Sequence, residues 1–264
     1  MAASIAGLAL LVWPGLWRYT APLQTPPERL LMIGAFFTRL HEIERRFSRS
    51  FGTDISTPAG RRAAKWHFYL SDHGVLRGLW TNMFQIAPGV WRSNQPSVAR
   101  LKRIKAMGIK TVLNLRGADK FSFYLFERET CAALGLTLID HKIYARQLVE
   151  RDRFLQLFEI FDRIEKPFVL HCKSGADRAG LASALWLLDK EGASISQAKK
   201  MLGLKYVHLK NTKTGVLDHL LDSYEADTAV TPMPVRQWFS ERYDPAAITA
   251  SFHAKMGWPP PMPT

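Results

Sequence analysis

Cysteine is scarce in this sequence, because the 264 residues include only two, Cys131 and Cys172. Small secreted domains depend on several disulfides, and two cysteines cannot supply such a framework. The scarcity argues against a disulfide-rich secreted domain and favours a reducing compartment, so we expect a cytoplasmic protein. Cys131 falls in a stretch with a helical pattern, 126–134, where we expect it to be a core residue.

Acidic residues are also few. The chain has 23 Asp and Glu against 36 Lys and Arg, which gives a net charge of +13 and an isoelectric point of about 9.9. A basic surface attracts anionic partners, such as phosphorylated substrates, acidic lipid headgroups or nucleic acid. No nucleic-acid-binding motif is present, so we expect no nucleic-acid partner. The charge is interpreted as attraction of a substrate or of a membrane surface, with a general solubilising surface as the alternative.

Long hydrophobic runs are missing as well. The apolar stretch at 5–13 is shorter than the ~20 residues that a membrane-spanning helix needs, and Pro14 follows it directly. No Lys or Arg precedes the stretch, so it lacks the positive segment of a signal peptide. Three interpretations stay open: a non-native start, an anchor at a membrane surface, or a disordered tail without function, which we prefer.

The residues that are present predict a folded domain with additions at both ends. Hydrophobic residues make up 47% of the chain, which is enough for a sizeable core. Thr57-Pro58 is a typical helix start, with an N-cap threonine and a proline in the first turn. The proline-rich end of the chain is interpreted as mobile. The predicted divisions are an apolar tail (1–25), a helical extension (26–83), a main domain (84–227) and a proline-rich tail (228–264).

Strand and helix patterns alternate within the predicted main domain. Short apolar or β-branched runs at 109–115, 136–143 and 168–170 predict strands, and the stretches between them have helical patterns. This order is typical of a mostly parallel central sheet with helices on both faces. We therefore predict an α/β fold with an N-terminal helical extension. In sheets of this kind, sites lie at the carboxyl ends of the strands.

The stretch 167–180 has the strongest functional pattern, Pro-Phe-Val-Leu-His-Cys-Lys-Ser-Gly-Ala-Asp-Arg-Ala-Gly. A short apolar strand is followed by Cys172, then by a loop, and then by an apolar helix from about Gly180. A loop that leads into a helix N-terminus directs backbone N–H groups inward, and these form a nest for an anion such as phosphate. Arg178 can bind two phosphate oxygens, and a thiol at the floor of the nest is placed to act as a nucleophile.

The combination His-Cys-x5-Arg, with its strand and helix, resembles the signature of the cysteine-dependent protein tyrosine phosphatases, in particular their bacterial dual-specificity and lipid-phosphatase branch. The segment at 88–117, "PGVWRSNQPS… GIKTVLNLRG", is similar to the same family. The resemblance therefore covers about residues 84–225, and it makes the predicted main domain the catalytic domain. It implies hydrolysis of phosphomonoesters through a phosphocysteine intermediate, without a cofactor or a metal ion.

The resemblance assigns roles within the loop. Cys172 is the nucleophile, and Arg178 and the loop N–H groups stabilise the charge on the phosphate oxygens. His171 orients the loop and helps to hold the thiolate, while Gly175 relieves strain in the turn. The predicted substrate-binding residues are His171, Lys173, Ser174, Gly175 and Ala176.

The reaction also needs a carboxylic acid, which protonates the leaving group and then activates water. Asp177 is preferred, because the sequence matches the form Cys-x-x-Gly-x-Asp-Arg in which related lipid phosphatases use the loop aspartate. Asp140 lies 32 residues before Cys172, like the mobile acid of dual-specificity enzymes, but it falls inside a predicted strand. Asp152 and Glu150 are weaker candidates.

One departure from the family pattern concerns the residue after the arginine. The family usually has Ser or Thr there, whose hydroxyl stabilises the departing thiolate, and this sequence has Ala179. We therefore expect the phosphocysteine to break down slowly. The basic segment 199–213 is interpreted either as a flank of the site that holds substrate or as a solvated surface.

Several functions stay open. The favoured function is that of a protein tyrosine or dual-specificity phosphatase. A phosphatase for a phosphatidylglycerophosphate or a phosphoinositide is an alternative, and a non-catalytic phosphate-binding module is another. A rhodanese-like sulfurtransferase is weaker, because its cysteine loop is usually shorter. The expected partner is a phosphorylated protein or an anionic phospholipid, with peripheral membrane contact in the second case, and the oligomeric state is not predicted.

Overall fold

The computed structural model describes residues 51–72 and 74–261. The chain divides into two units, 1–47 and 48–264, and all of the described residues belong to the second unit. The predicted apolar tail at 1–25 and the first part of the helical extension, 26–50, therefore lie outside the described residues.

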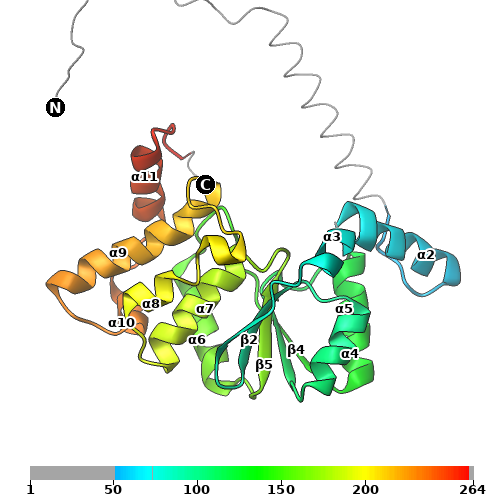
Figure 1. Cartoon of the computed structure of the whole chain (residues 1–264). Helices are drawn as coiled ribbons and strands as arrows, with labels where there is room; N and C mark the ends of the chain where they lie inside the picture. The colour runs from blue at the N-terminus through cyan, green and yellow to red at the C-terminus, as the bar shows by residue number, and fades with distance from the viewer. Residues whose placement is uncertain (1–50, 73, 262–264) are drawn as a thin grey trace, which may run out of the picture. The chain divides into compact units, whose positions relative to one another are not determined.

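A five-stranded sheet forms the centre of the described unit (Figure 1). The strands are β1 (Phe84–Ala87), β2 (Val90–Asn94), β3 (Thr111–Asn114), β4 (Thr137–Asp140) and β5 (Phe168–Cys172). Their order is β1-β2-β5-β3-β4, in which β1 is antiparallel to β2 and the other neighbours are parallel. The predicted mostly parallel sheet is confirmed, and its central strand β5 is buried along its whole length.

Helices cover both faces of this sheet, as predicted (Figure 1). Side chains of successive strand residues point to opposite faces, so Val112 and Val169 pack in one core and Leu113 and Leu170 in the other. The first core lies under α4 (Val98–Ala106) and α5 (Ser122–Leu134). The larger core is covered by α6 (Arg151–Arg163), α7 (Asp177–Lys190), α8 (Ile195–Lys199) and α9 (Val216–Val230), with the short 3₁₀ turns η2 (Leu204–Tyr206) and η3 (Lys213–Gly215) between α8 and α9.

The described part of the helical extension packs beside α5. It consists of α2 (Pro58–Trp66), a π-helical turn η1 (His67–Ser71) and α3 (Gly74–Leu79). The Thr57 side chain accepts a hydrogen bond from the Gly60 N–H at 3.0 Å, so the predicted N-cap is present. Phe68 packs against Phe123 and Tyr124 of α5. The described part of the extension is therefore in direct contact with the predicted main domain.

The prediction of a mobile tail at 228–264 is wrong for its described residues. Helix α9 continues to Val230, and α10 (Val235–Glu241) and α11 (Pro245–Met256) follow it. The aromatic side chains of Trp238, Phe239 and Tyr243 are fully buried in the larger core. The prolines do not prevent this packing, because Pro234 and Pro245 stand at helix starts, where a missing N–H costs nothing.

Candidate active site

The loop 173–176 lies between β5 and α7, and all four of its carbonyl oxygens accept hydrogen bonds from outside the loop. The Lys173 oxygen accepts from the Gln95 N–H (3.2 Å), the Ser174 oxygen from Asn82 Nδ2 (3.2 Å), and the Gly175 and Ala176 oxygens from Arg92 Nη2 (2.6 and 3.2 Å). The C=O and N–H groups of a trans peptide unit point in opposite directions. The loop N–H groups are therefore directed to the inner side, which is the arrangement of an anion nest.

Arg92 is the main brace of this loop. It lies on β2, and its side chain is fully buried. Its Nη1 donates to the Met201 carbonyl at 2.8 Å, and its guanidinium lies 3.7 Å from the centroid of the Tyr206 ring. Burial lowers the pKa of Arg92 to about 10, so the side chain is still charged at neutral pH. Arg92 both fixes the loop carbonyls and keeps a positive charge near Cys172.

Gly175 is the position at which the loop turns most sharply. Its φ angle is +74°, in the left-handed region. A Cβ atom at this position would lie 2.8 Å from the Asn94 nitrogen and 2.8 Å from the Ser93 carbonyl carbon. Because these are backbone atoms of β2 and cannot move aside easily, the loop approaches the strand as closely as it does only with glycine here.

The two cysteines differ in their surroundings. Cys172 ends β5, and its Sγ accepts a hydrogen bond from the Gly175 N–H at 3.3 Å, so the sulfur faces the inner side of the loop. Cys131 is buried in the core beneath α4 and α5, as predicted. Burial raises the pKa of Cys131 to about 12, which keeps this residue a thiol at neutral pH. Cys131 therefore has the properties of a packing residue.

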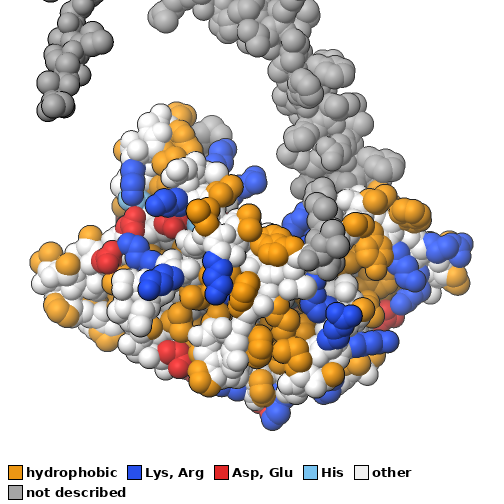
Figure 2. All heavy atoms as spheres, viewed as in Figure 1, with side chains coloured by type: hydrophobic (Ala, Val, Ile, Leu, Met, Phe, Trp, Pro, Cys, Tyr) orange, Lys and Arg blue, Asp and Glu red, His pale blue; other side chains and the backbone are white. Residues whose placement is uncertain are grey.

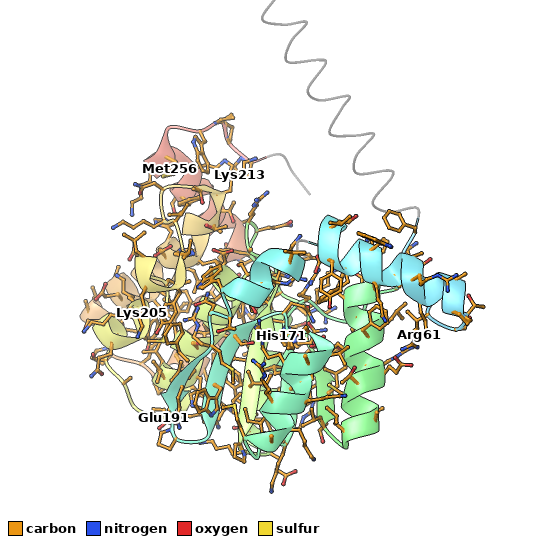
Figure 3. The ribbon with its side chains drawn as sticks, turned by 45° about the vertical axis from the view of Figure 1, so that its right-hand side comes forward. Arg61, His171, Glu191, Lys205, Lys213 and Met256 are labelled. Carbon is orange, nitrogen blue, oxygen red and sulfur yellow. The ribbon has the colours of Figure 1, made fainter. Side chains whose placement is uncertain are left out.

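His171 contacts a carboxylate that was not predicted from the sequence. Its Nε2 lies 2.8 Å from Oε1 of Glu127 on α5, and both side chains are almost completely buried. On the other side of the ring, Nδ1 lies 3.4 Å from the carbonyl oxygen of Cys172. Figure 3 shows His171 at the sheet, away from the molecular surface. The imidazole thus links α5 to the backbone from which the loop starts.

A cleft of about 980 Å³ opens at the loop. Its walls come from α3 and the residue after it, from the segment after β4, from the loop and the start of α7, and from η3. The lining residues are Arg77, Trp80, Tyr144, Ala145, Arg146, Gln147, Lys173, Ser174, Asp177, Arg178, Lys213 and Thr214. Five of these are Lys or Arg, so the cleft suits an anionic substrate. Nε of Arg178 is buried and has no hydrogen-bond partner within the described residues.

Asp177, the preferred acid, is bound to a histidine. His208 lies in the segment between η2 and η3, and its side chain is fully buried. Its Nδ1 is 2.8 Å from Oδ1 of Asp177, and its Nε2 is 2.6 Å from Oδ2 of Asp218 in the first turn of α9. Burial alone would lower the pKa of His208, but the hydrogen bonds to Asp177 and Asp218 raise it to about 9.

The other candidate acids lie elsewhere. Asp140 ends β4, where Oδ1 accepts from Asn114 Nδ2 at 2.8 Å and Oδ2 accepts from the Tyr124 hydroxyl at 2.6 Å. Glu150 and Asp152 stand at the start of α6. None of these three residues lines the cleft at the loop, whereas Asp177 lines it.

The helical extension contributes a buried carboxylate to the loop. Oδ1 of Asp72 lies 3.3 Å from Nζ of Lys173 and 2.9 Å from Nη2 of Arg116, and its Oδ2 lies 2.7 Å from Nη2 of Arg77. Burial alone would raise the pKa of Asp72, but Arg116, Arg77 and Lys173 together lower it to about 2. Lys173 is therefore held in place by a residue of the helical extension.

The basic segment 199–213 separates into residues with different surroundings. Lys213 lines the cleft, in agreement with the interpretation as a flank of the site. Lys199 instead forms ion pairs with Asp222 and Glu225 of α9, each at 2.6 Å. His208 is buried between two carboxylates. The basic pattern in the sequence does not separate the surroundings of Lys213, Lys199 and His208, because folding decides which groups lie next to each of them.

Two further observations concern metal ions and membranes. In the part of the chain that the structure describes, no group of three or more His, Cys, Asp or Glu side chains is arranged to hold a metal ion. Among the described helices, none has the length and hydrophobicity needed to cross a bilayer.

The sheet and the loop define a phosphatase of the protein tyrosine phosphatase type, and comparison with known families agrees. Residues 83–216, just over half of the chain, match the family described as a DSP-PTPase phosphatase fused to NAD⁺ kinase. The chain belongs to this family. The matched residues include the whole sheet and the loop with Cys172 and Arg178.

Solved structures of similar fold include TpbA from P. aeruginosa, in a complex of a variant with pTyr (16% identity, TM-score 0.47, 61% of this chain and 91% of TpbA). Tk-PTP is 20% identical, with a TM-score of 0.44 over 55% of this chain and 98% of its own. The catalytic domain of the PP-IP phosphatase SIW14 from S. cerevisiae is 14% identical, with a TM-score of 0.42 over 68% and 94%. A comparison with curated proteins finds no match.

Proposed function

We propose that this phosphatase hydrolyses phosphomonoesters by covalent catalysis, with Cys172 as the nucleophile. The supporting observation is the loop 173–176, whose carbonyl oxygens are all bound outward and whose inner side holds the Cys172 sulfur. A tetrahedral dianion fits a ring of N–H groups of this kind, and the Arg178 guanidinium supplies two further donors. The site then stabilises the charge that develops on the phosphate oxygens.

The reaction proceeds in two displacements. The Cys172 thiolate attacks phosphorus, so that an S–P bond forms while the bond to the leaving oxygen breaks, and Asp177 gives that oxygen a proton. Water then attacks the phosphocysteine, Asp177 takes a proton from the water, and the S–P bond breaks. Inorganic phosphate leaves, and the thiolate is restored. A thiol that must stay reduced fits the proposed cytoplasmic location.

The role of Asp177 as the acid leads to a prediction about leaving groups. Asp177→Asn should lower kcat on alkyl phosphates, which are poor leaving groups, by about 10²–10⁴-fold. Its effect on p-nitrophenyl phosphate should be far smaller, because p-nitrophenolate departs without a proton. Asp140→Asn is the matched control: since Asp140 is bound to Asn114 and Tyr124, its change should affect stability and leave the dependence on leaving group intact. Equal losses on both substrates in Asp177→Asn would contradict the assignment.

For the substrate, we propose phosphorylated tyrosine or serine in proteins. The aromatic side chains of Trp80 and Tyr144 line the cleft with the loop and are themselves partly exposed, so a phosphorylated side chain can pack against them on its way to Cys172.

A specific observation favours lipid phosphate as a second candidate. Exposed apolar side chains gather on the extension, beside basic ones, as Figure 2 shows. The apolar members are Trp66, Tyr69, Leu70 and Val75, and the basic members are Arg62 and Lys65; we call this set the extension patch. Aromatic and basic side chains together suit the interface of an anionic membrane. Trp80, which follows α3 of the extension, lines the cleft.

Phosphate release from two substrates separates these candidates. The purified protein is assayed under reducing conditions with a phosphotyrosine peptide and with phosphatidylglycerophosphate in vesicles. A protein phosphatase should release phosphate faster from the peptide, and Trp66→Ser should not change that rate. A lipid phosphatase should act faster on the vesicles, and Trp66→Ser should reduce that rate alone. If neither substrate is hydrolysed while phosphate still binds, the chain is a phosphate-binding module.

A further inference from the structure

His208 forms a buried bridge between the phosphate loop and helix α9. The side chain is fully buried. Both ring nitrogens lie within hydrogen-bonding distance of a carboxylate: Nδ1 of Asp177 on α7, and Nε2 of Asp218 on α9. A neutral imidazole can donate from only one nitrogen, whereas an imidazolium donates from both. Two carboxylate acceptors at 2.8 and 2.6 Å therefore select the charged, doubly donating form.

This arrangement has a consequence for Asp177. One carboxylate oxygen of Asp177, Oδ1, is occupied by His208, which fixes the orientation of the carboxyl group. Within the described residues no hydrogen bond is made by Oδ2, and the side chain lines the cleft. Proton transfer to a leaving group thus falls to Oδ2, and the carboxylate that results is next to a positive charge.

We propose that His208, backed by Asp218, is a positioning residue: its bond to Oδ1 holds the Asp177 carboxyl group so that Oδ2 meets the leaving oxygen, and the cleavage of poor leaving groups depends on it. This inference rests on the proposed role of Asp177. When the leaving oxygen takes the proton, the Oδ2–H bond breaks and its electrons stay on the carboxylate, whose Oδ1 keeps the hydrogen bond from His208. The imidazolium proton stays on His208 throughout, and no other reactant is required.

Four other cations lie near the Asp177 carboxylate. Arg92 interacts with Asp177 from β2, beneath the loop. Arg146, Arg178 and Lys213 share the cleft with it. Within the described residues none of these four cations is hydrogen-bonded to the Asp177 carboxylate, so His208 is the group that fixes its orientation.

The first test compares kcat/KM for an alkyl phosphate and for p-nitrophenyl phosphate in His208→Asn. Without the bond to Oδ1, the Asp177 carboxyl group can turn away from the leaving oxygen, so the rate on the alkyl phosphate should fall about 10-fold or more. The rate on p-nitrophenyl phosphate, whose leaving group needs no proton, should change little. Asp218→Asn keeps the ring but removes one of the two carboxylates that hold it, so it should lower the rate on the alkyl phosphate by less.

Controls separate this effect from a loss of structure. His219→Asn changes a histidine on α9 that binds Ser251 at 2.7 Å, and it should leave the ratio of the two rates unchanged. In an Asp177→Asn background, His208→Asn should no longer alter this ratio, because the group through which it acts is gone. Equal losses on both substrates in His208→Asn and Asp218→Asn would mean a purely structural role and would overturn the proposal.

A second measurement does not depend on activity. NMR titration of the His208 ring, assigned by comparison with His208→Asn, should show a charged imidazole well above pH 7 in the unmodified protein. Asp177→Asn should lower the pH of its titration by about 1 unit or more. If the unmodified protein releases no phosphate, the proposed function fails, and this titration still decides whether His208 and Asp177 are coupled. A His208 titration that Asp177→Asn leaves unchanged would overturn the inference in either case.

Discussion

Replacement of Cys172 by serine is expected to reduce phosphate release at least ~10⁴-fold, since loss of a nucleophile removes the covalent pathway itself. The hydroxyl is nearly isosteric, and the loop is held by Arg92, Asn82 and Gln95 through bonds that do not involve the sulfur. The variant should therefore fold and still bind phosphate or vanadate. The measurement is the steady-state rate on p-nitrophenyl phosphate, with ligand binding followed by thermal shift.

Cys131→Ser is the matched control for this prediction, because it makes the same chemical change at the other cysteine. Cys131 lies in the core beneath α4 and α5, and its thiol is protonated at neutral pH. The substitution should cost stability through burial of a hydroxyl, and kcat should change little. Substantial activity in Cys172→Ser, or loss of activity in Cys131→Ser at full stability, would contradict the assignment of the nucleophile.

Arg92→Met is expected to have the second largest effect, although Arg92 is outside the phosphate loop. Methionine fills much of the same space, but it leaves the carbonyl oxygen of Gly175 without its donor and that of Ala176 with the Gly180 N–H alone. The peptide units of Gly175 and Ala176 can then rotate, and the N–H groups of the loop no longer point to the same inner side. We expect kcat/KM to fall about 10²–10³-fold, as when an oxyanion donor is lost. The free energy of unfolding should fall by about 2–4 kcal/mol, because buried acceptors are left unsatisfied.

Arg100→Met distinguishes loop geometry from stability alone. Arg100 is also a mostly buried arginine, and it donates to the carbonyl oxygens of Thr81 and Arg77, not to those of the loop. Its loss should destabilise the protein to a similar degree, with a much smaller change in kcat/KM at a temperature where both variants are folded. Equal losses of kcat/KM in the two variants would show that Arg92 has no special connection with the loop.

The parts of the site that lie close together in the sequence could be predicted from it. Cys172, Arg178 and Asp177 belong to one short motif, and the strand and helix around them have clear apolar patterns. The residues that give the loop its shape are different: Arg92 is 83 positions from Gly175, and Asn82 is 92 positions from Ser174. A single sequence contains no signal for such pairs, because folding alone brings them together: Arg92 through the pairing of β2 with β5, and Asn82 from the segment before β1.

The same reason applies to the buried histidines. His171 on β5 meets Glu127 on α5, and His208 of the basic segment 199–213 meets Asp177 at the start of α7, only through tertiary packing. The C-terminal helices are a different case, because a local signal was present. Asp244-Pro245 is an N-cap and proline pair of the same kind as Thr57-Pro58. The Asp244 side chain accepts hydrogen bonds from the N–H groups of Ala246 and Ala247. The proline-rich composition predicts a mobile tail, but this pair marks the start of a helix, and the C-terminal helices pack into the larger core.

The central claim is that Cys172 takes the phosphoryl group from the substrate. It is tested most directly by acid quenching during turnover of p-nitrophenyl phosphate, followed by mass spectrometry of the peptide that contains Cys172. Because Ala179 cannot assist the departing thiolate, we expect the intermediate to accumulate, with one phosphoryl group on Cys172 and none in Cys172→Ser. Turnover without this adduct, or a phosphoryl group on another residue, would contradict the account.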